Sequence, residues 1–346
     1  MKALYLAGKK RFKLADVPAP SISRPDEVMV RIKSVGLCGS DIHYYLHGST
    51  AKEKSKFPFI IGHECAGEVA AAGSKARSFK PGDKVFVEPN VACFDCDMCA
   101  SGNYNYCRNQ KFMGYPGQME GAMREFCVMP SANLIRFGNG LTFDEALMAE
   151  PLSIALYSLS LSRRLAPRAV AVLGAGSIGL CLIKALKILH ERTAVYATDI
   201  IDERLALGIR NGAKRGFNPK SMKIVEEFRS ATDSKGVDAV FECAGVPQTV
   251  DQALEILKPG GTLFLIGIPE KPSVRFDADL FRKKGLTVTY IRRQNRQALK
   301  ALRMLEARIL DVRDIIGPVF DLEDAAAAFA AKVNKPETTV KPIIRI

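Results

Sequence analysis

The stretch RAVAVLGAGSIGLCLIKALKILHE, residues 168–191, decides the fold of the second half of the chain. It has the pattern of an apolar strand, a glycine turn and an amphipathic helix. Gly174, Gly176 and Gly179 fit G-x-G-x-x-G between a predicted strand and a predicted helix, which is the context that a dinucleotide site requires. The first glycine permits a tight turn, the second lets the backbone approach a pyrophosphate, and the helix N-terminus adds N–H donors. The stretch therefore predicts a dinucleotide-binding unit; a glycine turn needed only for packing is the alternative.

An acidic residue follows the glycine turn at the distance expected for a ribose contact. Asp199 lies twenty residues beyond Gly179, at the end of the next predicted strand. A carboxylate there hydrogen-bonds the ribose hydroxyls and repels a 2′-phosphate, so NAD is favoured over NADP. Arg204, five residues further on, could help to bind a phosphate, which keeps NADP open as an alternative.

The rest of the chain falls into zones of different periodicity. Residues 1 to about 150 alternate apolar and polar side chains in short runs, which predicts a mostly β, barrel-like domain. Apolar strands alternate with helices from about residue 165, which predicts α/β architecture with a doubly wound parallel sheet. The final segment, TVKPIIRI, resembles the strands of the first zone. We therefore expect one discontinuous domain of residues 1–155 and 293–346, and a second domain of residues 156–292.

Composition narrows the class of protein. The chain has 346 residues, 47% of them hydrophobic and 25% charged, so a full core is expected. The apolar run near the N-terminus, Ala3–Ala7, is too short for a signal peptide or a membrane span, which predicts a cytoplasmic protein with no membrane partner. The net charge of +13 is spread along the chain and predicts a solvated basic surface, with no nucleic-acid site.

A cluster of cysteines occurs in ACFDCDMCASGNYNYC, residues 92–107. A disulfide knot, a metal site and an iron–sulfur cluster compete as explanations. A cytoplasmic setting disfavours disulfides, and bacterial ferredoxin motifs use a shorter last gap followed by proline. The spacing favours a closed, tetrahedral structural zinc in a lobe of residues 90–108. Its ligands are expected to be Cys93, Cys96, Cys99 and Cys107.

A second set of metal ligands is dispersed over the first zone. GLCGSDIHYY supplies Cys38, IGHECAGEV supplies His63 and Glu64, and AEPLS supplies Glu150. A cysteine, a histidine and a carboxylate with one open position have the composition of a catalytic zinc site. Asp41 is a candidate for orienting a ligating imidazole.

Together these motifs resemble those of the zinc-dependent medium-chain alcohol dehydrogenases, over essentially the whole chain. The resemblance implies a GroES-like catalytic domain, a Rossmann domain and a dimer or tetramer. HYY, EPLSIALYS and IRRQN are most similar to segments of the polyol (sorbitol and xylitol) dehydrogenases. That similarity implies an enzyme with NAD and two zinc ions, which transfers a hydride from a secondary alcohol of a polyol to NAD and gives the ketose.

The resemblance also implies roles for individual residues. Cys38, His63 and Glu64 would hold the catalytic zinc with a water molecule, and Glu150 would contact that water, the metal or the substrate. Ser40 and His43 match a proton relay. The polyol would lie against Tyr44, Arg292 and Arg293. The remaining cofactor contacts are expected from Ile178, Asp199, Arg204, Ile266, Gly267, Ile268, Tyr290, Ile291 and Arg292.

Other functions remain open on the sequence. The substrate could be a sugar-alcohol phosphate, 2,3-butanediol or L-threonine, because arginine also suits phosphate and carboxylate groups. An iron–sulfur electron carrier built on residues 93–107 and a non-catalytic NAD-sensing protein are the alternatives from other classes. An open metal site beside a dinucleotide motif favours the enzyme.

Overall fold

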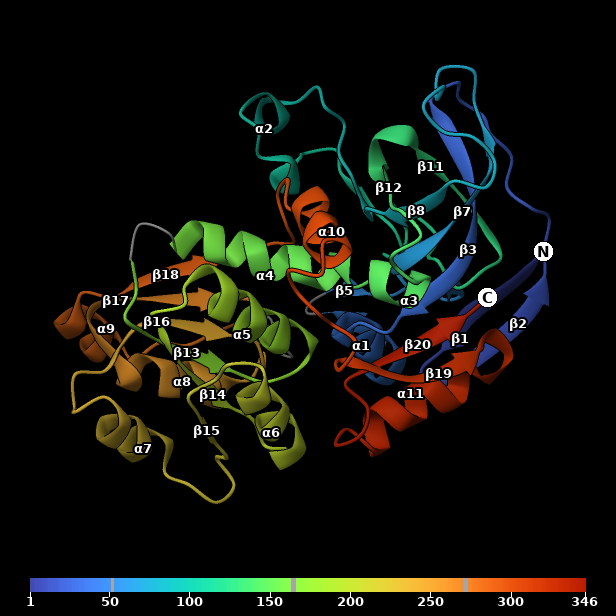
Figure 1. Ribbon diagram of the computed structural model, residues 1–346. Helices are drawn as coiled ribbons and strands as arrows, with labels where there is room; N and C mark the ends of the chain where they lie inside the picture. Colours follow the sequence, from blue (N-terminus) through green and yellow to red (C-terminus); the bar gives the residue numbers. More distant parts are fainter. Residues whose placement is uncertain (51–52, 163–165, 270–272) are drawn as a thin grey trace. The chain divides into compact units, whose positions relative to one another are not determined.

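The computed structural model describes residues 1–50, 53–162, 166–269 and 273–346. The chain forms two compact units, one of Met1–Glu150 with Asn295–Ile346 and one of Pro151–Gln294 (Figure 1). None of the helices in the described ranges is long and apolar enough to cross a membrane.

The second unit is built on a parallel sheet. Its strand order is β15-β14-β13-β16-β17-β18, so the order reverses between β13 and β16. In open sheets of this kind ligands bind at the carboxyl ends of the strands where the order reverses. Strands buried on both faces need continuous apolar runs, and Val170 to Leu173 are fully buried. The strands are β13 (Ala169–Leu173), β14 (Ala194–Thr198), β15 (Arg215–Phe217), β16 (Val237–Glu242), β17 (Leu257–Leu265) and β18 (Thr287–Tyr290).

Helices connect these strands in two groups. α5 contacts α6, whereas α8 contacts both α7 and α9. Connections between parallel strands are right-handed, so reversal of the strand order moves the connecting helices to the opposite face of the sheet. The two groups of helices therefore cover opposite faces (Figure 1). The predicted doubly wound α/β architecture is confirmed. The helices are α4 (Ala149–Ser162), α5 (Ser177–Leu189), α6 (Asp202–Arg210), α7 (Ile224–Ala231), α8 (Pro247–Ile256) and α9 (Ala278–Lys284).

One boundary in this unit differs from the sequence prediction. The segment PQTVDQALEILKPGG, residues 247–261, has the pattern of a helix throughout, which predicts a helix of that length. In the structure the helix ends at Ile256, and residues 257–261 belong to β17. Pro259 explains the difference, because proline cannot donate to a helix and disfavours helical backbone in the residue before it.

The first unit is mostly β. Its largest sheet has the order β12-β8-β7-β3-β20-β19, and β11 also pairs with β3. β20, near the C-terminus, pairs antiparallel with β3, so the end of the chain returns to this unit. Its strands are β1 (Lys2–Gly8), β2 (Arg11–Asp16), β3 (Glu27–Gly36), β4 (Ser49–Thr50), β5 (Glu53–Lys54), β6 (Phe59–Ile60), β7 (Glu64–Ala72), β8 (Lys84–Val87), β9 (Asn90–Val91), β10 (Lys111–Phe112), β11 (Phe126–Pro130), β12 (Leu134–Arg136), β19 (Ile316–Asp321) and β20 (Lys341–Arg345).

Short helices lie between the strands of the first unit. α1 begins directly after β3, and its end is marked by Gly48 with a φ of 70°. Glycine favours that left-handed conformation because it has no Cβ. The main core lies between the sheets and α11, and includes Val30, Ile32 and Phe329. The helices are α1 (Gly39–His47), α2 (Asp97–Ala100), α3 (Phe143–Ala146), α10 (Ala298–Glu306) and α11 (Ala325–Asn334).

Candidate metal and cofactor sites

Three predicted metal ligands meet at the junction of β3, α1 and β7. Cys38 caps α1, while His63 directly precedes β7 and Glu64 is its first residue. The antiparallel register pairs Gly36 with Glu64. This pairing brings Cys38 close to His63, which follows it by 25 positions in the chain. The ligand atoms of Cys38, His63 and Glu64 all lie within 4.8 Å of one another.

The histidine in this group is oriented by a buried carboxylate. Asp41 is fully buried; its Oδ2 accepts the Cys38 N–H at 2.9 Å, and its Oδ1 lies 3.6 Å from His63 Nδ1. Among the described residues no donor lies within hydrogen-bond distance of Oδ1. This geometry leaves Nε2 of His63 for a metal, in the arrangement by which carboxylates orient ligating imidazoles.

The electrostatics of the group suit a bound cation. Burial lowers the pKa of His63, but the charges of Asp41 and Cys38 outweigh it and raise the pKa well above its usual value. Burial and the Glu64 carboxylate raise the pKa of Glu150 to about 8. Groups that are anionic when deprotonated thus lie together in one buried site. A divalent metal that binds there would displace their protons.

The donor set fits zinc. One thiolate, one imidazole and one carboxylate are zinc ligands, and three protein ligands leave a fourth tetrahedral position open. Glu150 is buried and acts electrostatically on Glu64 and His63, although it stands outside the three-residue group.

The four predicted cysteines of the lobe also come together. Sγ of Cys107 lies 3.4 Å from Sγ of Cys93 and 4.0 Å from Sγ of Cys96, and Cys99 completes the set within 4.8 Å. Sulfurs about 2.3 Å from a central zinc stand roughly 3.8 Å apart in a tetrahedron, so these spacings suit one ion. All four cysteines are free thiols here, and a separation of 3.4 Å is too long for a disulfide.

Local hydrogen bonds stabilise the thiolate forms of two of these cysteines, Cys93 and Cys96. The backbone N–H groups of Arg108 and Cys99 lower the pKa of Cys96 to about 6, and the N–H of Asp95 lowers that of Cys93. In contrast, burial and the neighbouring thiols raise the pKa of Cys99 to about 12. A metal would have to displace the proton of Cys99.

The second unit carries the glycine turn at the carboxyl end of β13. Gly174 has a φ of 99°, which only glycine adopts readily. A Cβ at Gly179 would lie 1.9 Å from the Gly174 carbonyl oxygen, so this glycine allows the helix to pack against the turn. A Cβ at Gly176 would meet no protein atom within 4 Å. The open space at Gly176, at the N-terminus of α5, fits a pyrophosphate.

This difference predicts the effect of alanine at Gly176. Its φ of −74° is allowed for alanine, so Gly176→Ala is expected to leave the thermal midpoint of unfolding unchanged. The added methyl would occupy the space of the pyrophosphate and weaken NAD binding about 10-fold to 100-fold. Fluorescence titration with NADH measures this, with Gly179→Ala as the destabilised control. Unchanged NADH affinity in a folded Gly176→Ala protein would contradict the assignment.

Asp199 is fixed beside the same turn. Its Oδ2 accepts the Ala175 N–H at 2.8 Å, and its Oδ1 accepts the Ile201 N–H at 3.0 Å. Burial raises the pKa of Asp199, and the positive charge of Arg204 opposes this effect. Each carboxylate oxygen keeps a further lone pair for a ribose hydroxyl. The Asp199 carboxylate therefore holds the glycine turn in place and could also accept hydrogen bonds from a ribose.

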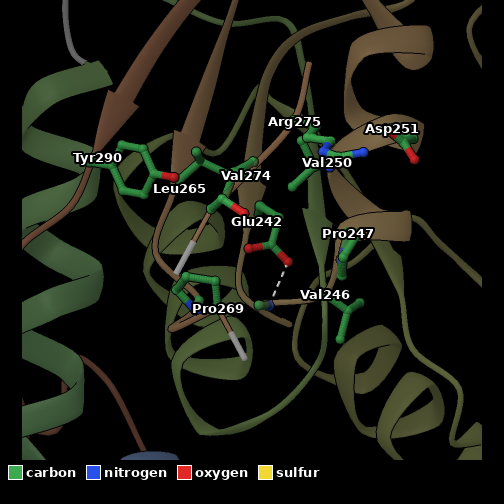
Figure 2. A pocket seen from close by; sticks show the side chains of 13 residues that line it. Glu242, Val246, Pro247, Val250, Asp251, Leu265, Pro269, Val274, Arg275 and Tyr290 are labelled. Atoms are coloured by element: carbon green, nitrogen blue, oxygen red, sulfur yellow. Dashed lines mark hydrogen bonds between the residues drawn. The ribbon is translucent and has the colours of Figure 1, made fainter. Parts of the chain in front are cut away.

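A cavity of about 340 Å³ lies near the ends of β16, β17 and β18. Glu242 and Tyr290 line it together with Gly267, and Figure 2 shows Glu242 between Tyr290 and the start of α8. Glu242 Oε1 accepts the Ala244 and Gly245 N–H groups, each at 2.8 Å, which fixes the loop between β16 and α8. Gly267 and Tyr290 were predicted to contact the cofactor, and Ile266 and Ile268 flank Gly267 in the chain.

The remaining predicted residues have different settings. Tyr44 is buried, its hydroxyl accepts from Thr50 Oγ1 at 3.2 Å, and its ring packs edge-on against Phe59. Ser40 and His43 are half-buried on α1. The other residues belong to the second unit: Ile178 on α5, Arg204 on α6, buried Ile291, exposed Arg292, and half-buried Arg293, whose φ is 55°.

The sequence analysis missed two charged residues of these sites, Lys341 and Glu242. Lys341 is 1% exposed, and its Nζ donates to Glu64 Oε2 at 2.5 Å. A signal was present in the sequence, since Lys341 is flanked by Val340 on one side and by Pro342, Ile343 and Ile344 on the other. Glu242 likewise ends a buried apolar strand, at 1% exposure.

Comparison with known proteins shows which family the chain resembles over nearly its whole length. The family profile "Alcohol dehydrogenase GroES-like domain" matches residues 24–139, and "Zinc-binding dehydrogenase" matches residues 177–307. The chain is 31% identical to a sorbitol dehydrogenase of Bacillus subtilis over 344 residues, covering 99% of this chain and 97% of that protein. It is 29% identical to a D-xylulose reductase of Saccharomyces cerevisiae, again covering 99% and 97%. The crystal structure of galactitol-1-phosphate dehydrogenase from Escherichia coli superposes with a TM-score of 0.89 at 28% identity, covering 99% of each chain.

A GroES-like β unit with a zinc-type ligand set and a dinucleotide-binding sheet define a zinc-dependent dehydrogenase. The chain belongs to the zinc-dependent medium-chain alcohol dehydrogenases. The predicted family, the predicted fold class and the prediction of an alcohol or polyol dehydrogenase are confirmed.

Proposed function

We propose that the chain oxidises a secondary alcohol of a free polyol such as sorbitol or xylitol to the ketose, with NAD as the hydride acceptor. The observation that carries the proposal is the convergence of Cys38, His63 and Glu64 within 4.8 Å, with the Cys38 segment and His63 held by Asp41. Its relatives include proteins named sorbitol dehydrogenase and D-xylulose reductase, which supports a polyol.

In this proposal Cys38, His63 and Glu64 hold the catalytic zinc, with Glu150 beside it, and Cys93, Cys96, Cys99 and Cys107 hold the structural zinc. When bound, the catalytic zinc supplies a Lewis acid that acidifies the alcohol, and NAD supplies the hydride acceptor. Asp41 orients the His63 ring, and the Gly176 backbone admits the pyrophosphate. Asp199 favours NAD, because its fixed carboxylate would repel a 2′-phosphate.

Ser40 and His43 are proposed to carry the alcohol proton to solvent. Both lie on α1, which begins at Cys38, and both are half-buried. Tyr44, Arg292 and Arg293 are proposed to bind substrate hydroxyls, and Arg292 also to contact the cofactor with Ile178, Arg204, Ile266, Gly267, Ile268, Tyr290 and Ile291.

The relay predicts a pH-dependent defect. His43→Ala is expected to slow alcohol oxidation about 10-fold to 100-fold below about pH 7, where hydroxide is scarce, and less at higher pH. The zinc content should stay unchanged, since His43 is outside the ligand set. Rates measured across pH test this prediction. A pH–rate profile that coincides with that of the wild type would rule out the relay.

A substrate panel tests the function itself. Sorbitol, xylitol, galactitol 1-phosphate, 2,3-butanediol and L-threonine are each assayed with NAD and with NADP by absorbance of the reduced cofactor. We expect the highest kcat/KM with a free polyol and NAD. The phosphate ester is the second candidate, because the galactitol-1-phosphate enzyme is a structural relative and the chain carries a charge of +13. Activity on none of the five would contradict the proposal.

We further propose a cytoplasmic location and a homo-oligomer, either a dimer or a tetramer. The location is supported by the zinc ligand sets, since five of the expected ligands are thiolates that a reducing compartment preserves. Size-exclusion chromatography with light scattering measures the number of subunits.

A further inference from the structure

Lys341 is a buried cation that the reaction scheme above does not use. It begins β20 and is 1% exposed, and the strand residues that follow it are apolar until Arg345. Its Nζ donates to Glu64 Oε2 at 2.5 Å and to the Leu37 carbonyl oxygen at 3.2 Å. One ammonium group therefore joins the Glu64 side chain to the backbone directly before Cys38.

Stability alone does not account for this pair. Glu64 is also 1% exposed, so both charges have left water at a cost that their attraction barely repays. Buried ion pairs can often be replaced by apolar residues of similar size without loss of stability. A charged pair in an apolar strand environment, in contact with a candidate metal ligand, therefore points to a role in the site.

The sheet makes room for the pair. β3 stands between β7 and β20, and Gly36 is in register with Glu64 on one side and Ile343 on the other. A Cβ at Gly36 would lie 2.8 Å from Glu64 Oε2 and 3.3 Å from Lys341 Cδ. Only glycine leaves this space free, so Gly36 of β3 permits the contact between Lys341 and Glu64.

We propose that Lys341 is a positioning residue for the catalytic metal site: its hydrogen bond fixes Oε2 of Glu64, so that Oε1 would be available to a metal. The inference rests on the proposed function, in which Glu64 is a zinc ligand. Without Lys341, the Glu64 carboxylate loses the donor that fixes its orientation, and it becomes a less well-oriented ligand. Groups that hold metal ligands in this way change metal affinity about 10-fold to 100-fold when removed.

Zinc retention in the full-length protein tests the proposal. Lys341→Met removes the charge and the donor at similar length, and Lys341→Gln keeps a donor without the charge. Under increasing chelator, Lys341→Met is expected to release one zinc at a chelator concentration about 10-fold to 100-fold lower than the wild type requires. Lys341→Gln should lie between the two. The zinc of the cysteine cluster should be retained equally in all three proteins, and it serves as an internal control for folding.

Arg345→Met is the matched control variant. Arg345 lies on the same strand and pairs with Asp144 at 3.0 Å, but it is exposed. This variant should release zinc as the wild type does. Cobalt(II) exchanged for the more weakly held zinc supplies a second readout, because its visible spectrum reports coordination geometry. The spectrum should change in Lys341→Met and stay the same in Arg345→Met.

The outcomes separate the two proposals. Two zinc ions in every protein, with unchanged or tighter retention and an unchanged cobalt spectrum in Lys341→Met, would overturn the role of Lys341 and leave the proposed function standing. A wild-type protein that binds only the cysteine-cluster zinc would overturn both. Should Lys341→Met fail to fold, Lys341→Gln carries the same test, and wild-type retention in that variant would overturn the inference.

Discussion

Replacing Cys38 with serine is expected to lower kcat for alcohol oxidation by about 10³-fold or more. Lewis-acid stabilisation by a metal is worth several kcal/mol, and each 1.4 kcal/mol changes the rate about tenfold. In the proposed site Cys38 supplies the thiolate of a three-ligand group, so its loss would leave only an imidazole and a carboxylate. Metal analysis should find one zinc per chain in place of two, and steady-state kinetics with the preferred polyol should show the loss of rate.

Cys127→Ala is the control for this experiment. Cys127 is a fully buried cysteine of the same unit, on β11, and it stands outside both ligand groups. This variant should keep two zinc ions and a normal kcat. If Cys38→Ser also kept two zinc ions and a normal kcat, Cys38 would not be a ligand.

Replacing Cys99 with serine is expected to have the largest effect on stability. The buried cluster of the lobe consists of Ala92, Cys99 and Cys107, with Tyr104 and the other two cysteines packed against it. So small an apolar cluster cannot hold a lobe by hydrophobic burial alone. Structural zinc sites contribute roughly 10 kcal/mol or more to the folding of small domains, and Cys99→Ser should lose a large part of this free energy.

The lobe variant should differ from the Cys38 variant in its readouts. Limited proteolysis should cut Cys99→Ser within residues 90–108, and one zinc should be lost. The rate per remaining zinc should change little, because a closed structural site performs no chemistry. Retention of two zinc ions with wild-type protease resistance would refute the structural site.

Local motifs carried most of the predictions about the sites. The cysteine spacing and the glycine turn each lie within a few residues of sequence, so their geometry follows from the local chain. The doubly wound parallel sheet could be predicted because buried apolar strands alternate with helices along the sequence, a pattern that parallel sheets require. The helix predicted over residues 247–261 was too long, because the apolar pattern continues past Ile256 whereas Pro259 disfavours helical backbone.

Contacts made by distant segments could not be predicted in the same way. α1 was not predicted, because nine residues between β-type segments give too little periodicity, and its N-terminus depends on a bond from the Cys38 N–H to Asp41. The contact of Lys341 with Glu64 joins residues 277 positions apart. It exists only because β20 and β7 both pair with β3 in a particular register, which the sequence does not specify by itself.

Anomalous diffraction at the zinc absorption edge tests the central claim most directly. The site assignments predict two zinc peaks per chain. One should lie among Cys38 Sγ, His63 Nε2 and one Glu64 oxygen, and the other among the four sulfurs of Cys93, Cys96, Cys99 and Cys107. A single zinc peak at the cysteine cluster, or iron in place of zinc there, would contradict it.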